Sequence, residues 1–154
     1  MEPLKQFICD KCGEIIEKPE DGYVIWREDT NRQLSNILIV HHNYRDDYGI
    51  AHDCDNNHTM YPLSLPLVSF LGSDGLVNIL SMVDPGPNFI PEYRDLIGNK
   101  REFMEFVRRV QIPYYEEARI YWDKAQSEGF FVDANEDWTY LPDTLKELIA
   151  RYKE

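Results

Sequence analysis

The sequence predicts an α+β fold in which a small β-rich module packs against a bundle of about four α-helices. Three observations lead to this prediction. All three cysteines and all four histidines lie in residues 1–61, among short β-branched and aromatic runs. Residues 62–154 instead carry apolar residues at helical spacing. Hydrophobic residues make up 43% of the chain, enough for a core that both parts share. We therefore expect a β module over 1–61 and a helical domain over 62–154, packed together.

Two strands and their turns are expected in the β module. Residues 22–27 (GYVIWR) are β-branched and aromatic, and residues 37–42 (ILIVHH) open with a continuous apolar run typical of a buried strand. Turns are predicted at 17–22 and at 28–32 from their polar and turn-forming residues. A polar loop is expected over 43–58.

Four helices are expected in the second part, beginning at Ser73, Asn99, Pro113 and Pro142. Asn99 followed by Glu102 has the pattern of a capping box, and proline is favoured in a first helical turn. Residues 130–132 are expected to be an extended bridge. The residues predicted to face inward are Leu76, Ile79, Leu80, Val83, Phe103, Phe106, Val107, Val110, Tyr114, Ala118, Tyr121, Trp122, Ala125, Leu145, Leu148, Ile149 and Tyr152.

A metal site is predicted from the cysteines. The run from Cys9 to Gly13 is a Cys-x-x-Cys turn followed by glycine, which presents two thiolates to one side of a metal. We expect Gly13 to let the backbone turn under the sulfur atoms without a Cβ clash. Zinc prefers four tetrahedral thiolate and imidazole ligands, so Cys54, the remaining thiol, is expected as the third ligand and a histidine as the fourth. The predicted ligands of a structural Zn²⁺ are Cys9, Cys12, His41 and Cys54.

The choice among the histidines rests on spacing. His41 ends the predicted buried strand, and a histidine there with a cysteine after a loop suits zinc-ribbon geometry better than the crowded pair His52 and Cys54. His42 is the second choice and His52 the third, and His58 stays open as an alternative.

Three runs in this part carry a resemblance to known proteins. Residues 7–14 (FICDKCGE), 21–26 (DGYVIW) and 39–42 (IVHH) together resemble the zinc-ribbon modules of small, uncharacterised bacterial proteins. The resemblance covers the first third of the chain, and the gap from Cys12 to His41 is longer than in a compact ribbon. It implies a metal-stabilised scaffold without an assigned activity, and it carries over three cysteines and one histidine.

Other chemistries fit the sequence less well. A redox Cys-x-x-Cys normally precedes a helix, and residues 13–19 do not resemble one. A catalytic zinc keeps an open position, whereas three cysteines and a histidine close the set. The run beginning at Asp53 resembles a calcium loop but lacks the glycine and glutamate that such a loop needs. Glu116 and Glu117 are adjacent carboxylates and are expected to be surface charges.

Charge narrows the choice of partner. The net charge of −12 repels phosphate backbones, so nucleic acid is not the expected partner. The sequence has one cluster of basic residues, which comprises Lys100, Arg101, Arg108 and Arg109. We expect these charges mainly to stabilise helix ends, with Arg101 and Arg108 exposed.

No run is apolar enough for a membrane span, and no signal peptide is recognised, so a reducing cytoplasm is expected.

Together these features predict a non-catalytic, zinc-stabilised interaction or regulatory protein with a protein partner. One alternative is a nucleic-acid-binding zinc ribbon that uses the face of Arg101 and Arg108. Another is a metal-dependent hydrolase whose candidate residues are His42, His52, His58, Asp53 and Asp55.

Overall fold

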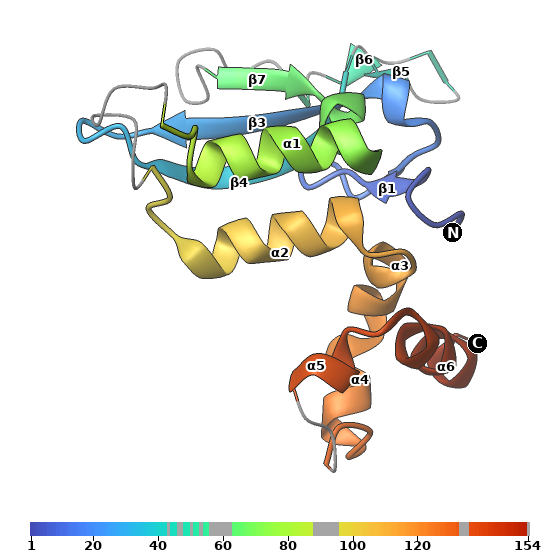
Figure 1. Cartoon of the computed structure of the whole chain (residues 1–154). Coiled ribbons are helices and arrows are strands. Elements are labelled where there is room, and N and C mark those ends of the chain that lie inside the picture. The colour runs from blue at the N-terminus through green and yellow to red at the C-terminus, as the bar shows by residue number, and fades with distance from the viewer. Residues whose placement is uncertain are drawn as a thin grey trace.

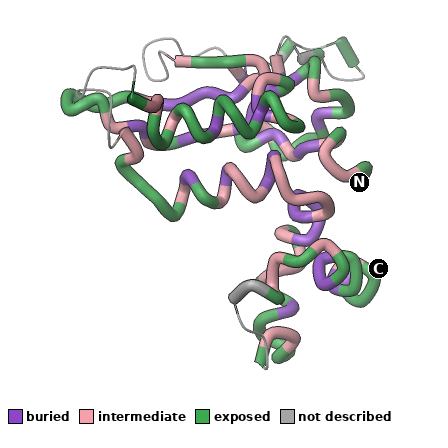
Figure 2. The backbone as a smooth tube through the Cα atoms, viewed as in Figure 1, coloured by how far each residue is buried: buried purple, intermediate pink, exposed green. Residues whose placement is uncertain are grey.

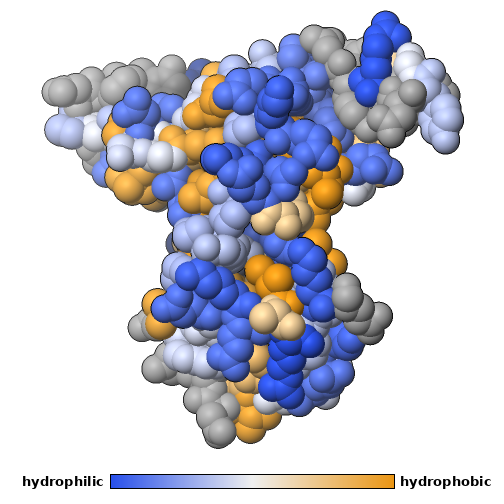
Figure 3. Space-filling view, turned by 90° about the vertical axis from the view of Figure 1, so that its right-hand side faces the viewer, coloured by the Kyte–Doolittle hydropathy of each residue, from blue (hydrophilic) through white to orange (hydrophobic). Residues whose placement is uncertain are grey.

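The computed structural model describes residues 1–42, 44–45, 48–49, 51–52, 54–55, 63–87, 96–132 and 136–153. Within them the protein is α+β, with small antiparallel sheets and several helices, which confirms the predicted class. A wide upper part holds the sheets together with α1 and α2, and a lower part holds the later helices (Figure 1). A side view shows the narrowing between the two parts (Figure 3). Among the helices of the described residues, none combines the length and apolar character that a bilayer crossing requires.

The main sheet has three antiparallel strands in the order β4-β3-β7. Both predicted strands are confirmed, β3 as Gly22–Glu28 and β4 as Leu34–His41. Gly22 pairs with His41 in the register, so the end of β4 lies beside the start of β3. The other edge of β3 pairs with β7 (Leu63–Pro66). This pairing makes β3 the central strand.

Two short hairpins accompany the main sheet. β1 (Phe7–Ile8) pairs with β2 (Ile15–Ile16) on either side of the Cys-x-x-Cys turn. β5 (Tyr44–Arg45) pairs with β6 (Ala51–His52) in the segment where a polar loop was expected. A 3-10 turn, η1 (Pro19–Asp21), leads into β3.

The first hydrophobic cluster joins the sheets to α1 (Gly72–Val83) and α2 (Lys100–Gln111). Phe70 lies at its centre, with edge-to-face ring contacts to Trp26 at 6.4 Å and to Phe106 at 5.2 Å between centroids. Buried residues mark β3, β4 and parts of both helices (Figure 2). The cluster takes residues from both predicted parts of the chain, so these parts pack together as expected.

A second hydrophobic cluster forms below the first and contains short helices. Its fully buried centre is made by Ala118, Ala125, Leu145 and Leu148. The elements are α3 (Tyr115–Ala118), η4 (Arg119–Tyr121), α4 (Trp122–Ser127), α5 (Glu136–Thr139) and α6 (Pro142–Tyr152). The described helices are thus divided between two clusters and do not form the single bundle that was expected. The domain boundary between residues 61 and 62 stays a prediction.

Several local predictions have a definite outcome. The cap at Asn99 is confirmed, because its side-chain oxygen accepts a hydrogen bond of 3.2 Å from the backbone nitrogen of Glu102. The Glu102 carboxylate does not complete a capping box and instead accepts from the backbone nitrogen of Ile37 at 2.6 Å. The helix expected from Pro113 to Gly129 is interrupted by η4.

The inward face predicted for α1 is confirmed at Ile79 and wrong at its other three residues. Gly75 and Ile79 are the buried residues of this helix, whereas Leu76, Leu80 and Val83 are exposed. The reason is a close backbone contact: a Cβ on Gly75 would lie 2.0 Å from the carbonyl carbon of Phe70 in the 3-10 turn η2 (Leu67–Phe70). The helix therefore packs through its glycine side and turns its leucines towards solvent.

The bridge expected at residues 130–132 is also wrong, because this segment is a turn. Phe130 and Phe131 contact each other edge to face, with 5.1 Å between ring centroids. Phe131 also lies 4.8 Å from the ring of Trp122. Aromatic packing within the second cluster accounts for the compact conformation.

Candidate metal centre

Four side chains from separate segments meet beside the main sheet. Cys9 and Cys12 lie in the turn of the β1–β2 hairpin, His41 ends β4, and Cys54 follows β6. One ligand atom from each lies within 4.8 Å of those of the other three. The structure thus brings together the four residues that the sequence singled out, and this group can hold a metal ion.

The backbone of the cysteine turn is held by its own hydrogen bonds. The backbone nitrogen of Cys9 donates to the carbonyl of Glu14, and that of Gly13 donates to the carbonyl of Cys9, both at 2.9 Å. Gly13 has a φ of +79°, which disfavours any residue with a side chain. A Cβ at this position would meet open space. The glycine is therefore needed for its backbone conformation, and the expected Cβ clash is not the reason.

His41 is oriented through both of its ring nitrogens. Nδ1 lies 3.4 Å from the Cys12 sulfur, and Nε2 lies 3.2 Å from the carbonyl oxygen of Ile15. A carbonyl accepts only from a protonated nitrogen, so this contact favours the tautomer with its proton on Nε2. The lone pair on Nδ1 then faces the cysteines, as a metal ligand requires.

Burial shapes the chemistry of the three thiols. Cys9 and Cys54 are 1% and 5% exposed, and His41 is 2% exposed. Desolvation, followed by the proximity of Cys9, raises the pKa of Cys54 to about 12. Desolvation also raises the pKa of Cys12 above its ordinary value. A bound cation favours the thiolate forms, so it would remove the cost of burying three sulfur ligands together.

The donor set indicates what this centre can do. Three sulfurs and one imidazole nitrogen form a soft tetrahedral set of the kind that structural zinc sites use. With four protein ligands, no coordination position is left for water or a substrate. The arrangement therefore suits a structural metal better than a catalytic one.

Comparisons with known proteins add no relative. The chain matches no protein-family model, no curated protein and no solved structure. The resemblance to zinc ribbons therefore stays a prediction that depends on the cysteine turn and the strands around it.

The remaining candidate residues do not join the cluster within the described part of the chain. His42 turns to Asp55, with 2.5 Å between Nδ1 and Oδ2, and its ring stacks on Tyr23 at 4.2 Å. His58 and Asp53 lie outside the described residues, as does the side chain of His52. The run from Asp53 that resembles a calcium loop, an interpretation already disfavoured by its sequence, falls largely in the same segment. Of the five hydrolase candidates, the described residues show the pairing of His42 with Asp55.

A buried ion-pair network next to the centre was missed at the sequence level. Arg109 is only 4% exposed and donates to both oxygens of Asp10, at 2.9 and 2.7 Å. It also donates to both oxygens of Glu116, at 2.7 and 2.8 Å, and to the carbonyl of Ile8 at 2.9 Å. Arg109 lies in the last turn of α2 as expected, but the expectation that it acts mainly as a helix-end charge is wrong, because it is a buried ion-pair partner. Its position three residues after the buried Phe106 was the available signal.

The acidic pair that follows α2 is buried as well. Glu116 is 5% exposed and Glu117 is 7% exposed, so their prediction as surface charges is wrong. Both are compensated: Glu116 by Arg109, and Glu117 by Lys153 and the amino group of Met1, each at 2.7 Å. Desolvation opposes ionisation of Glu117, but hydrogen bonds from these two cations outweigh it and lower its pKa.

Asp10 connects this network to the metal centre. It lies between Cys9 and Cys12, and its backbone nitrogen donates to the carbonyl of Ile39 at 2.8 Å. Its carboxylate accepts from the backbone nitrogen of Ile39 at 2.7 Å. Asp10 thereby fixes the cysteine turn against β4 while Arg109 ties it to α2.

Proposed function

We propose that this chain is a non-catalytic interaction protein of the cytoplasm whose β-rich part is a zinc ribbon held by a structural Zn²⁺ ion. The observation that carries the proposal is the group of three cysteines and His41, all buried except the half-buried Cys12, which leaves no position for a substrate. The hydrogen bond from His41 to a backbone carbonyl supports the same assignment, because it orients the imidazole for a metal.

The surface of α1 supports a role in binding another protein. Leu76, Val77, Leu80 and Val83 are exposed by 44, 61, 57 and 47%. A solvated helix face normally carries charged residues, and α1 contains no lysine or arginine and one carboxylate, Asp74. A row of exposed apolar side chains of this kind is typical of an interaction site.

The occupant we propose for this face is α1 of a second copy of the chain. Two α1 helices that pack antiparallel would bury their leucines against each other, and twofold dimers are the commonest soluble oligomers. The two Asp74 carboxylates would then lie at opposite ends of the contact, so no like charges would face each other. In antiparallel packing the two helix dipoles also point in opposite directions, which is electrostatically favourable.

The metal is tested on protein purified without chelators. We expect metal analysis to give about one zinc per chain, since one four-ligand site is present. A value well below one equivalent would refute the zinc proposal. Chelation should unfold the β-rich part while much helical circular dichroism remains, because the second cluster has a core of its own. Complete loss of the helical signal on chelation would contradict a metal role confined to the β-rich part.

The interaction surface is tested by sedimentation velocity on the zinc-loaded chain. We expect dimers at roughly tens of micromolar and loss of the dimer in Leu80→Lys, which places a charge in the contact. The matched control is Val132→Lys, which introduces the same charge at an apolar residue that is 79% exposed and lies in the turn packed on the second cluster, which α1 does not join. A monomeric wild-type chain, or equal behaviour of the two variants, would refute the proposed occupant.

A further inference from the structure

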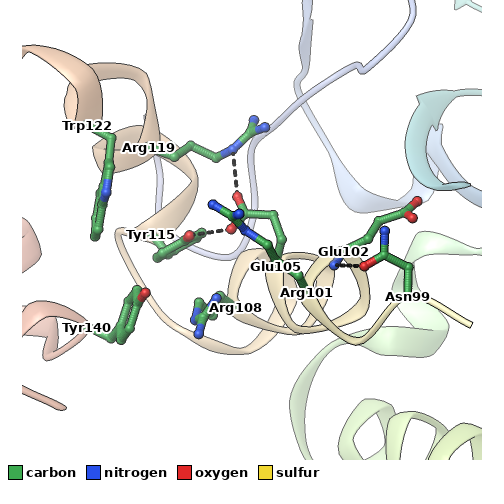
Figure 4. A pocket seen from close by; sticks show the side chains of 9 residues that line it. All are labelled: Asn99, Arg101, Glu102, Glu105, Arg108, Tyr115, Arg119, Trp122 and Tyr140. Carbon is green, nitrogen blue, oxygen red and sulfur yellow. Dashed lines mark hydrogen bonds and ion pairs between the residues drawn. The ribbon is translucent and has the colours of Figure 1, made fainter. Parts of the chain in front are cut away.

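A groove lies between α2 and the short helices of the second cluster. It has a volume of about 530 Å³, which is within the range of roughly 300–1,000 Å³ that small-molecule sites occupy. One wall carries arginines of α2, and the opposite wall carries aromatic rings of the lower part (Figure 4). The side chains that line it are Asn99, Arg101, Glu102, Glu105, Arg108, Tyr115, Arg119, Trp122 and Tyr140. The metal centre contributes none of them.

The arginines of the groove differ in how they are neutralised. Arg119 pairs with Glu105 at 3.3 Å and lies 3.8 Å from Glu116. Within the part of the chain that the structure describes, neither Arg101 nor Arg108 has a carboxylate within ion-pair distance. In a chain of net charge −12, two uncompensated guanidinium groups in one groove form a local attraction for anions.

The carboxylates of the groove are already engaged. Glu105 accepts a hydrogen bond of 2.5 Å from the Tyr115 hydroxyl in addition to its pair with Arg119. Glu102 accepts from the backbone nitrogen of Ile37 at 2.6 Å and so belongs to the sheet contact. Neither carboxylate therefore competes with a ligand for the two arginines.

The aromatic wall adds a flat apolar surface. The rings of Trp122 and Tyr140 are nearly parallel, 11° apart in orientation and 5.8 Å apart between centroids. The guanidinium of Arg108 lies 4.1 Å from the centre of the Tyr140 ring. This contact holds Arg108 in place before any ligand arrives and lowers the entropy lost on binding.

We propose that this groove binds a small organic phosphate with a planar ring, in the chemical class of a mononucleotide. Guanidinium groups match phosphate oxygens through paired hydrogen bonds, which places the phosphate at Arg101, because the Arg108 guanidinium already lies on the Tyr140 ring. The planar ring lies against Trp122, beside the Arg108 guanidinium that covers Tyr140, as bases do on aromatic side chains and arginine. Arg101 and Arg108 are separated by about 10 Å along α2, so the groove is long enough for both portions of such a ligand.

The proposal is tested on the zinc-loaded full chain by calorimetry and by NMR titration. The probes are adenosine monophosphate, adenosine and inorganic phosphate. We expect saturable binding of adenosine monophosphate, roughly tenfold or more tighter than that of adenosine, because only the former engages the guanidinium groups. The amide shifts should be confined to α2, the segment from α3 to α4, and Tyr140.

Two variants locate the phosphate. Arg101→Gln removes a guanidinium from the groove and should weaken binding of adenosine monophosphate by roughly tenfold while leaving adenosine binding unchanged. The matched control is Lys100→Gln, which removes one positive charge from the neighbouring residue, outside the lining of the groove. Its affinity for adenosine monophosphate should stay within about twofold of the wild type.

The outcomes that overturn the proposal are distinct. They are absence of saturable binding of adenosine monophosphate, equal weakening in the two variants, and amide shifts centred on the cysteine cluster. A single-stranded oligonucleotide that binds while the mononucleotide does not would also overturn it, and would show instead that the groove recognises a nucleic acid strand.

Discussion

Replacing Arg109 with methionine should strongly destabilise the fold. Methionine fills a similar volume but cannot donate the five hydrogen bonds that Arg109 makes to Asp10, Glu116 and Ile8. The Glu116 side chain, 6% exposed, would remain buried without its main counter-charge, and the Asp10 side chain, 16% exposed, would lose its guanidinium partner. Loss of one partner of a buried ion pair costs about 3–5 kcal/mol.

The expected loss in the free energy of unfolding lies at the lower end of that range. Glu116 would keep a hydrogen bond of 2.8 Å from the backbone nitrogen of Ile8 and the nearby guanidinium of Arg119. We therefore expect about 3 kcal/mol. The matched control is Arg108→Met, which removes the same charge from the preceding residue. Arg108 lies over the Tyr140 ring, so this substitution should cost about 0.5–1 kcal/mol.

The assay is urea unfolding of the zinc-loaded chain, followed by circular dichroism. Arg109→Lys keeps the charge but loses the planar fork, so it should fall between the wild type and Arg109→Met. Arg109 holds the Asp10 carboxylate, and Asp10 fixes the cysteine turn against β4. Arg109→Met should therefore also release zinc to a chelator faster. Equal free energies of unfolding for the two methionine variants would refute the reasoning, since it depends on the burial of Arg109.

Three further predictions concern single residues. His41→Ala should lower zinc retention measured by metal analysis, whereas His42→Ala should not, because the His42 ring lies outside the cluster; equal retention would contradict the assignment. Gly75→Ala should lower the urea midpoint by an amount equivalent to about 1–3 kcal/mol or more, since its Cβ would lie 2.0 Å from a backbone carbon; an unchanged midpoint would contradict this packing. Glu117→Gln should destabilise the chain near neutral pH and progressively less in acid, because a lowered folded-state pKa gives stability above an unfolded pKa of about 4.3 that is lost as the carboxylate protonates. A difference between wild type and Glu117→Gln that does not shrink in acid would contradict the ion pair with Lys153.

Local patterns in the sequence predicted much of the β-rich part and the metal centre. β3 and β4 were visible because apolar and β-branched residues dominate them. The cysteine turn identified two members of the cluster by spacing alone, and the place of His41 at a strand end identified a third. These signals need no knowledge of how distant segments pack.

Long-range contacts account for what the sequence could not predict. The burial of Arg109 depends on Asp10, which lies 99 residues earlier, so a helix pattern alone marks Arg109 as a surface charge. The exposed leucines of α1 depend on the backbone contact between Gly75 and Phe70. The groove depends on how α2 packs beside the helices of the second cluster, and no local sequence pattern encodes this packing.

The shared guanidinium of Arg109 has a consequence for how this chain can change over evolutionary time. Losing Arg109 leaves the buried Glu116 without its main counter-charge, and losing either carboxylate leaves the buried Arg109 guanidinium with unfilled hydrogen bonds, so single substitutions at these positions should be selected against. Replacing the three charges together with apolar residues of similar volume can be neutral or even stabilising. Descendants of a common ancestor should therefore either keep all three charges or lose them as a set, which would appear as covariation between residue 10 and residues 109 and 116.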